Sequence, residues 1–167
     1  MEAMLDTLPG MRAVMEEAGV TALDMRMVDL AEGWFTDEID PAGYDAIEAA
    51  SNPETSIAIP AEADVAGIGR RETHAPVYLL QRDGELMLLV LPMRAAGYQS
   101  TITTMLALEP DLRTVAALTV TGHGETPGIG ARIADPAFAA RWPGKQVADD
   151  TGEIIIEVVR AQASGPY

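Results

Sequence analysis

The sequence predicts an α+β fold in which one antiparallel β-sheet carries helices packed on it. Two features indicate the sheet: short apolar runs rich in β-branched residues recur in the second half of the chain, and turn signals separate them. A helical stripe of apolar residues near the N-terminus indicates the covering layer. Because 167 residues with 48% hydrophobic side chains can bury one core, we expect one domain over residues 1–167. We divide it into a leading helix, an α/β and crossing segment, and a β-rich core, over residues 1–20, 21–75 and 76–163.

The N-terminal part begins with a helix and a short strand. Apolar residues at helical spacing cover residues 4–18, and Gly19 ends the stripe. Residues 25–30 alternate between apolar and polar as a strand does, and Gly33 and Trp34 fall in the turn that follows. The helical stripe consists of Met4, Leu5, Leu8, Met11, Val14, Met15 and Ala18.

A second helix and a long crossing segment follow. Asp40-Pro41 opens a helix near residues 44–50, because aspartate is a good N-cap and proline fits the first helical position. Residues 51–69 are rich in Pro, Glu and Ala, and we interpret them as a crossing over the surface. Four aliphatic side chains would anchor this crossing: Ile57, Ile59, Val65 and Ile68.

The β-rich core contains two hairpin signals and a last strand. The Asp83-Gly84 pair between two apolar runs is a strong sign of a tight hairpin turn. Residues 109–113 connect the second pair of runs, and a turn at residues 150–152 precedes the last strand. Residues 135–141 predict a short helix that would cover a face of the sheet. The expected strands are residues 77–81, 85–92, 101–108, 114–121 and 154–159.

Composition and charge exclude several kinds of partner. The chain has 11 basic and 26 acidic residues, a formal net charge of −15, and its single lysine is Lys145. Such a surface repels phosphate backbones and anionic lipid head groups, so we expect no nucleic-acid partner. No apolar run approaches the ~18 residues that a spanning helix needs, so we expect no direct membrane insertion by this chain. The first six residues do not resemble a secretory signal, because they carry acids instead of a basic stretch.

The segment His123-Gly124-Glu125-Thr126-Pro127-Gly128-Ile129-Gly130 is the most informative motif. It directly follows the apolar run at residues 114–121, so it lies where a strand of the sheet ends. Its backbone amides face open space there, and such a loop can hold a flat or anionic ligand. A turn that uses Gly and Pro only for its own geometry is the other interpretation of this spacing.

Metal and thiol chemistry have no support in the sequence. The chain has no cysteine, which removes disulfides, thiolate ligands and thiol catalysis together. His74 and His123 are about fifty residues apart, without the His-x-x-x-His or Glu-x-x-His spacing of a zinc site. We therefore expect no metal site and no catalytic acid–base pair, and a structural role for both histidines.

The order and spacing of four segments resemble one protein family. The segments R-R-E-T-H-A-P-V-Y-L, G-Y-Q-S-T through L-A-L-E, H-G-E-T-P-G-I-G and R-W-P-G-K occupy residues 70–79, 97–109, 123–130 and 141–145. In this order they resemble the C subunit of the sodium-translocating NADH:quinone oxidoreductase, whose family includes the G subunit of the Rnf electron-transport complex. The resemblance covers essentially the whole chain, and E-T-P-G-[LI]-G is its specific motif. It implies a fold of the FMN-binding domain type.

The resemblance also implies a flavin site in this chain. Glu125 and Thr126 would hydrogen-bond ring heteroatoms or the ribityl chain, and Gly128 and Gly130 would let a planar ring approach the backbone. Ile129 would add an apolar contact. The full set of expected FMN-binding residues is Tyr98, Ser100, Glu125, Thr126, Pro127, Gly128, Ile129 and Gly130.

Covalent attachment of FMN is not expected in this chain. In the family, FMN is joined through its phosphate to a threonine in an S-G-A-T-x-[ST] motif that follows the strand corresponding to residues 153–160. No Ser-Gly-Ala-Thr occurs in residues 1–167. We therefore expect FMN to be bound noncovalently or not at all.

The family further implies location and role. Its members place this domain on the extracytoplasmic, periplasmic face of the bacterial inner membrane, anchored by one N-terminal helix that this chain does not include. The implied role is a one-electron relay between subunits of a respiratory complex, with electrons that originate at NADH elsewhere and no turnover by the isolated domain. Two alternatives remain open: an Rnf-type G subunit, and a flavin-free scaffold or interaction module with the same fold.

Overall fold

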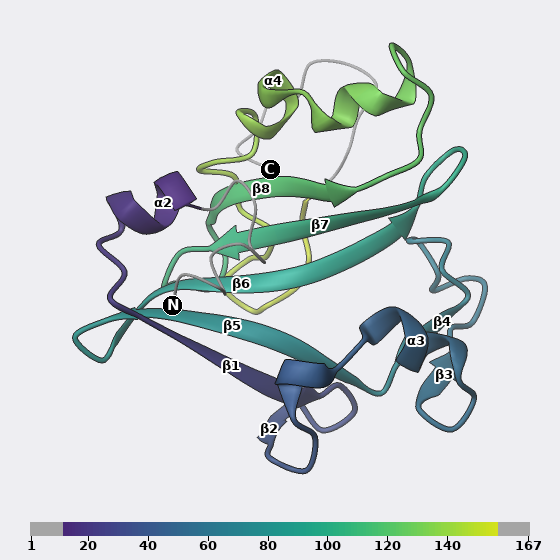
Figure 1. Ribbon diagram of the computed structural model, residues 1–167, viewed down its shortest axis with the longest axis horizontal. Coiled ribbons are helices and arrows are strands. Elements are labelled where there is room, and N and C mark those ends of the chain that lie inside the picture. The colour runs from purple at the N-terminus through teal and green to yellow at the C-terminus, as the bar shows by residue number, and fades with distance from the viewer. Residues whose placement is uncertain (1–11, 157–167) are drawn as a thin grey trace.

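A computed structural model describes residues 12–156, and β-strands dominate this part of the chain (Figure 1). Its main sheet has six strands in the order β2-β1-β5-β6-β7-β8, and every neighbouring pair is antiparallel. These strands are β1 (Ala22–Asp29), β2 (Trp34–Thr36), β5 (His74–Arg82), β6 (Glu85–Ala96), β7 (Thr101–Leu108) and β8 (Val115–Gly122). The predicted α+β class with an antiparallel sheet is confirmed.

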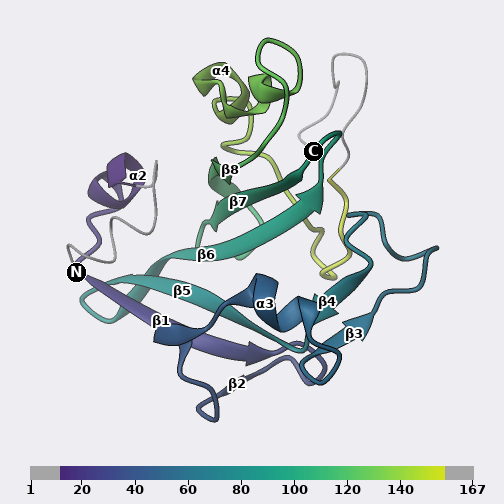
Figure 2. The ribbon, with the colours of Figure 1, turned by 45° about the vertical axis from the view of Figure 1, so that its right-hand side comes forward.

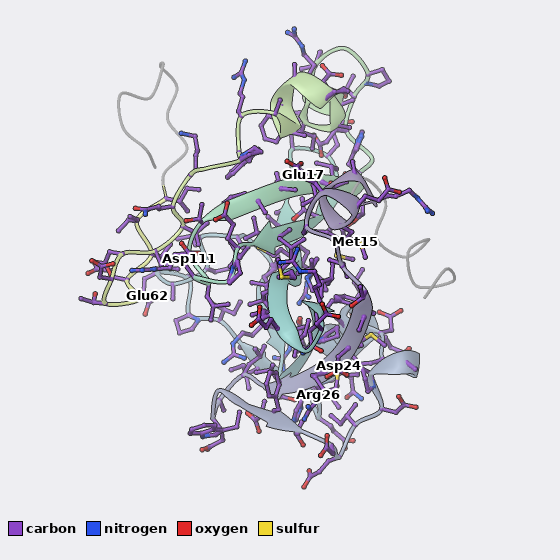
Figure 3. All side chains as sticks on the ribbon, turned by 90° about the vertical axis from the view of Figure 1, so that its left-hand side faces the viewer. Met15, Glu17, Asp24, Arg26, Glu62 and Asp111 are labelled. Carbon is purple, nitrogen blue, oxygen red and sulfur yellow. The ribbon has the colours of Figure 1, made fainter. Side chains whose placement is uncertain are left out.

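Short helices cover both faces of this sheet (Figure 1). Met15 packs on one face against a cluster that includes Leu80, Val90 and Ala107, and Figure 3 shows it beside the sheet. Because side chains alternate along a strand, Leu106 points to the opposite face, where Phe138 of α4 and Trp142 pack. The described helices are α2 (Arg12–Glu17), η1 (Pro41–Gly43), α3 (Ala46–Ser51), η2 (Gly130–Ala134) and α4 (Pro136–Ala139).

The two predicted hairpins are present. Asp83 and Gly84 both have positive φ, 53° and 86°, which is the backbone geometry of the tight turn that joins β5 to β6. The β7–β8 pair extends over nearly the predicted residues. Gly19 has φ +65° and follows α2, so the predicted end of the first helix is also confirmed.

The prediction of one helix near residues 44–50 is wrong, because two short helices, η1 and α3, replace it. Asp40 accepts a hydrogen bond from the amide of Ala42 and caps η1. Asp45 then accepts from the amides of Ile47 and Glu48 and caps α3. Each aspartate therefore begins a separate helix, and the backbone between them is extended at Tyr44.

The crossing at residues 51–69 contains a strand that the sequence pattern did not predict. β3 (Ser56–Ala58) pairs with β4 (Arg70–Glu72) in a small second sheet, and α3 contacts β4 and β5 beside it (Figure 2). Two of the four expected anchors are wrong, because Ile57 is exposed and Val65 is 99% exposed. The segment is held instead by polar contacts: Asp64 accepts from the amides of Ile68 and Gly69 at 3.0 and 2.7 Å.

Other boundaries differ at the ends of elements. Trp34 begins β2 and is not in the turn, and β1 starts three residues before the predicted strand. Asp24 and Arg26 project from the same side of β1, as alternation requires (Figure 3). The predicted helix over residues 135–141 is shortened to the four residues of α4.

The predicted segments at the two ends lie partly outside the described residues. Residues 4–11 of the first helix and residues 157–159 of the last strand belong to these parts. In the described part of that strand, Ile154 forms an isolated bridge with Ala148 instead of a ladder.

Candidate functional site

Two loops meet at one end of the main sheet. The first, residues 97–100, joins β6 to β7, and the second, residues 123–130, follows β8. They are neighbours because β7 pairs with both β6 and β8: Thr101 lies opposite Ala96, and Thr103 lies opposite Gly122. The sequence predicted that these two segments form one site, and the sheet brings them together.

The buried carboxylate of Glu125 holds the two loops together. Its Oε1 accepts hydrogen bonds from the amides of Gln99 and Ser100 at 3.0 and 3.1 Å, and from Ser100 Oγ at 3.2 Å. Glu125 is only 7% exposed. The donors are loop amides that an anionic acceptor satisfies best, so Glu125 acts as a fixed bridge between the loops.

Ser100 and Thr126 complete this bridge. Ser100 Oγ accepts from the amide of Gly124 at 2.7 Å, and Thr126 Oγ1 donates to Gln99 Oε1 at 2.8 Å. Side chains of each loop therefore bond to the other loop in both directions. Gln99 was not among the predicted site residues, and its only signal in the sequence was its position between Tyr98 and Ser100.

Glycines make room for the Glu125 side chain. A Cβ on Gly97 would lie 2.4 Å from Glu125 Oε1, and a Cβ on Gly130 would lie 2.7 Å from Oε2. Gly128 differs, because a Cβ there meets nothing within 4 Å but its φ of +77° disfavours other residues. The E-T-P-G-I-G spacing thus has a local physical basis. Gly128 adopts the positive φ of the turn, and Gly130 has no Cβ that would collide with the Glu125 carboxylate.

The charge of this bridge is permanent near neutral pH. The amide of Gln99, which donates to the carboxylate, holds the pKa of Glu125 below the usual value of a glutamate, while burial pushes it upward to a lesser extent. A ligand at this end of the sheet therefore meets a fixed negative charge behind the loop amides.

Two large apolar side chains stand outward from the bridged loops. Tyr98 is 94% exposed and Ile129 is 76% exposed, one on each loop. Pro127 and Gly128 are also exposed, whereas Ser100 and Thr126 are half-buried. The structure thus divides the eight predicted residues into an inner group that fixes the loops and an outer group that is open to a ligand.

The two histidines have local partners. His123 Nδ1 accepts from the amide of Glu125 at 3.2 Å, and His74 Nδ1 lies 3.0 Å from Thr73 Oγ1. Within residues 12–156, no group of three or more His, Asp or Glu side chains is arranged to hold a metal ion. In the same part of the chain, no helix is long and apolar enough to cross a membrane.

A pocket on the α2 face of the main sheet was not predicted. It has a volume of about 290 Å³ and lies between Tyr44, which follows η1, and the sheet residues Tyr78 and Met105. The ion pair of Arg94 and Glu72 borders it. The only sequence signal for this site was an arginine within the otherwise apolar run of β6.

Comparisons with known proteins agree with the position of the loops. The FMN-binding domain family model matches residues 97–163, a range that begins at the first residue of the first loop. The chain is 44% identical over 135 residues to the C subunit of the Na(+)-translocating NADH-quinone reductase of Pseudomonas aeruginosa, covering 81% of this chain and 52% of that protein. It is 36% identical over 155 residues to the same subunit from Yersinia pestis, covering 91% of this chain and 58% of that protein.

A solved structure extends this likeness to three dimensions. The crystal structure of Shewanella oneidensis NqrC superposes with a TM-score of 0.78 at 32% identity, covering 92% of this chain and 68% of that one. The chain spans a little over half the length of the two curated relatives described above.

Proposed function

The chain belongs to the NqrC family, and from this membership we propose that it is the FMN-carrying domain of the C subunit of a Na+-translocating NADH-quinone reductase. The observation that carries the proposal is the pair of bridged loops with Tyr98 and Ile129 outward. Exposed apolar side chains on two fixed neighbouring loops are what a planar ring needs for contact. The FMN-binding domain match includes both loops.

Different side chains would contact the ring and hold the loops in place. Tyr98 and Ile129 would contact the faces of the isoalloxazine ring, and Gly128 lets the ring approach the backbone without a Cβ in the way. Thr126 and Ser100, which already bond to the opposite loop, set the distance between these contacts. When bound, FMN supplies one-electron transfer chemistry, and the protein contributes position and electrostatics.

Glu125 would influence the cofactor chiefly through its charge. Its carboxylate is occupied by loop donors, so it is not available to accept a hydrogen bond at Oε1 from a ring nitrogen. The direct ring contact expected from the sequence would then involve Oε2. A fixed negative charge near the ring disfavours its anionic reduced form, and therefore lowers the reduction potential.

The relatives are the basis for placing the domain in a membrane complex. The partners would be other subunits of the reductase, the position would be the periplasmic face, and electrons would come from NADH elsewhere in the complex. Both curated relatives described above carry the name of the reductase and neither that of the Rnf complex, which favours the reductase over an Rnf-type subunit. FMN would be held by noncovalent contacts in these residues.

An FMN titration of the purified chain tests this proposal against the flavin-free scaffold. We expect saturable quenching of flavin fluorescence that Glu125→Ala and Gly128→Val both weaken. Two residues outside the loops serve as matched controls. Asp149 also caps a turn by accepting from backbone amides, and Gly144 has a φ of +80° and nothing within 4 Å of its Cβ position.

Asp149→Ala and Gly144→Val should leave FMN affinity unchanged while removing comparable local features. Equal weakening by all four variants would show a general loss of fold and contradict a loop site. A folded chain that binds no FMN at millimolar concentration would favour the scaffold.

A further inference from the structure

We propose that the pocket beside η1 and α3 is a second ligand site, which takes a small neutral aromatic molecule that carries a carbonyl oxygen. The pocket contains none of the residues of the two flavin loops. Its volume of about 290 Å³ is roughly twice that of a cavity that accepts benzene, and it lies near the lower limit of pockets for small molecules. It therefore has room for one ring or two, but not for a nucleotide.

The walls of the pocket are suited to a flat apolar body. Tyr44 and Tyr78 line the pocket, and Met105, which lies on the same face of the sheet as Tyr78, adds a flexible thioether side chain. Aromatic and methionine side chains make favourable contacts with ring faces and edges. The hydroxyl of Tyr44 is already used, because it donates to the carbonyl of His74 at 2.6 Å.

Arg94 supplies the polar contact. Its Nη2 donates to Glu72 Oε2 at 2.5 Å and to the carbonyl of Arg70 at 3.4 Å, but neither Nε nor Nη1 has a partner in the described chain. The side chain is only 14% exposed. Since no buried side-chain nitrogen or oxygen of the described residues lacks a partner, these free N–H groups must be open to solvent, and Arg94 borders this pocket.

The charges around the pocket select a neutral acceptor over an anion. Glu72 already neutralises Arg94, and its carboxylate borders the same pocket, so a ligand carboxylate would be repelled by a nearby like charge. The net charge of −15 acts in the same direction. A ketone, amide or similar carbonyl oxygen accepts a hydrogen bond from a guanidinium without this cost.

The test uses three one-ring probes: acetophenone, ethylbenzene and benzoate. Binding is followed by NMR of 13C-labelled methionine methyl groups, in which Met105 should shift while Met15, which packs in the core under α2, should not. One hydrogen bond to a charged donor predicts that acetophenone binds about tenfold more tightly than ethylbenzene. Benzoate should bind more weakly than acetophenone.

Two variants separate the apolar and polar parts of the site. Ala46→Leu fills the pocket and should abolish binding, whereas Ala42→Leu, on an exposed η1 residue outside the pocket, should not. The double variant Glu72→Leu with Arg94→Met replaces the buried pair by apolar side chains, a change that proteins often tolerate. It should bind acetophenone and ethylbenzene equally.

Several results would overturn the proposal. These are an absence of a shift at Met105, equal affinity of wild type for acetophenone and ethylbenzene, or a preference for benzoate. Displacement of acetophenone by FMN would show that the pocket belongs to the flavin site and is not a second one. The proposed FMN function is independent of these results, since it fails only if FMN does not bind.

Discussion

Gly97→Ala tests whether the Glu125 carboxylate is seated against the first loop as the geometry indicates. The new Cβ would lie 2.4 Å from Glu125 Oε1, 2.8 Å from Ile102 Cδ1 and 2.8 Å from the carbonyl oxygen of Ser100. Gly97 does not have a positive φ, so crowding alone decides the outcome. All three distances are below 3.0 Å, and the Ser100 carbonyl belongs to the backbone, so the loop or the Glu125 side chain must shift to admit the methyl group.

The expected loss of stability follows from overpacking. Adding a methyl group to a well-packed site costs about 1–3 kcal/mol, and 1 kcal/mol changes the melting temperature of a domain of this size by about 2–4 °C. We therefore expect the melting temperature to fall by roughly 2–12 °C in differential scanning calorimetry. Gly43→Ala is the matched control, because Gly43 also lacks a positive φ and has nothing within 4 Å of its Cβ position. If Gly97→Ala melts at the same temperature as Gly43→Ala, the carboxylate does not occupy this position.

Two further predictions concern the charge of Glu125 and the helical cover. The pKa of Glu125 is lowered in the folded state, so its ionised form stabilises the fold above the unfolded value of 4.5, and this stabilisation is lost as the pH falls through the lower folded pKa. The melting temperature of Glu125→Gln should therefore be lower than that of wild type at pH 7, with a gap that narrows below pH 4.5; an equal gap at pH 3 would contradict this. Met15→Ala should destabilise by about 2–5 kcal/mol in urea titrations, because Met15 is 5% exposed and joins α2 to the sheet. Glu16→Ala, an exposed neighbour on the same helix, should change stability by less than about 0.5 kcal/mol.

The sequence predicted those parts of the molecule that depend on short-range patterns. Asp83-Gly84 specifies its own turn, and alternation specifies which residues of the paired strands face the core. Two of the four anchors predicted for the crossing at residues 51–69 are wrong, because this segment is also held by hydrogen bonds from backbone amides to Asp64, which hydrophobic patterns do not reveal. The prediction of one helix near residue 44 failed because two aspartates five residues apart each cap a separate start.

The candidate site shows the same division. The E-T-P-G-I-G motif located the second loop, but the role of Glu125 depends on donors 25 and 26 residues away in sequence, which only the β7 pairings bring within reach. The Arg94–Glu72 pair also joins separate strands, 22 residues apart. In both cases the residue types were visible in the sequence, whereas their partners required the sheet.

The bridged loops predict that the site is ordered before any flavin binds. The amides of Gln99, Ser100 and Gly124 each donate to a side chain of the opposite loop. Amides in such bonds exchange with solvent only when the local structure opens. A site that is already ordered does not lose loop entropy on binding, so its contacts contribute more fully to affinity.

Hydrogen exchange measured by NMR on the flavin-free chain tests this order. Gln99, Ser100 and Gly124 should exchange at least about tenfold more slowly than Gly128, whose exposed amide lies in the same loop without such an acceptor. Glu125→Ala should accelerate exchange at Gln99 and Ser100, because their shared acceptor is removed. Exchange at Gly124 should change less, because its acceptor is Ser100 Oγ. If all four amides exchange at one rate in wild type, the loops become ordered only with the ligand, and the fixed spacing of Tyr98 and Ile129 would then be a consequence of binding instead of its cause.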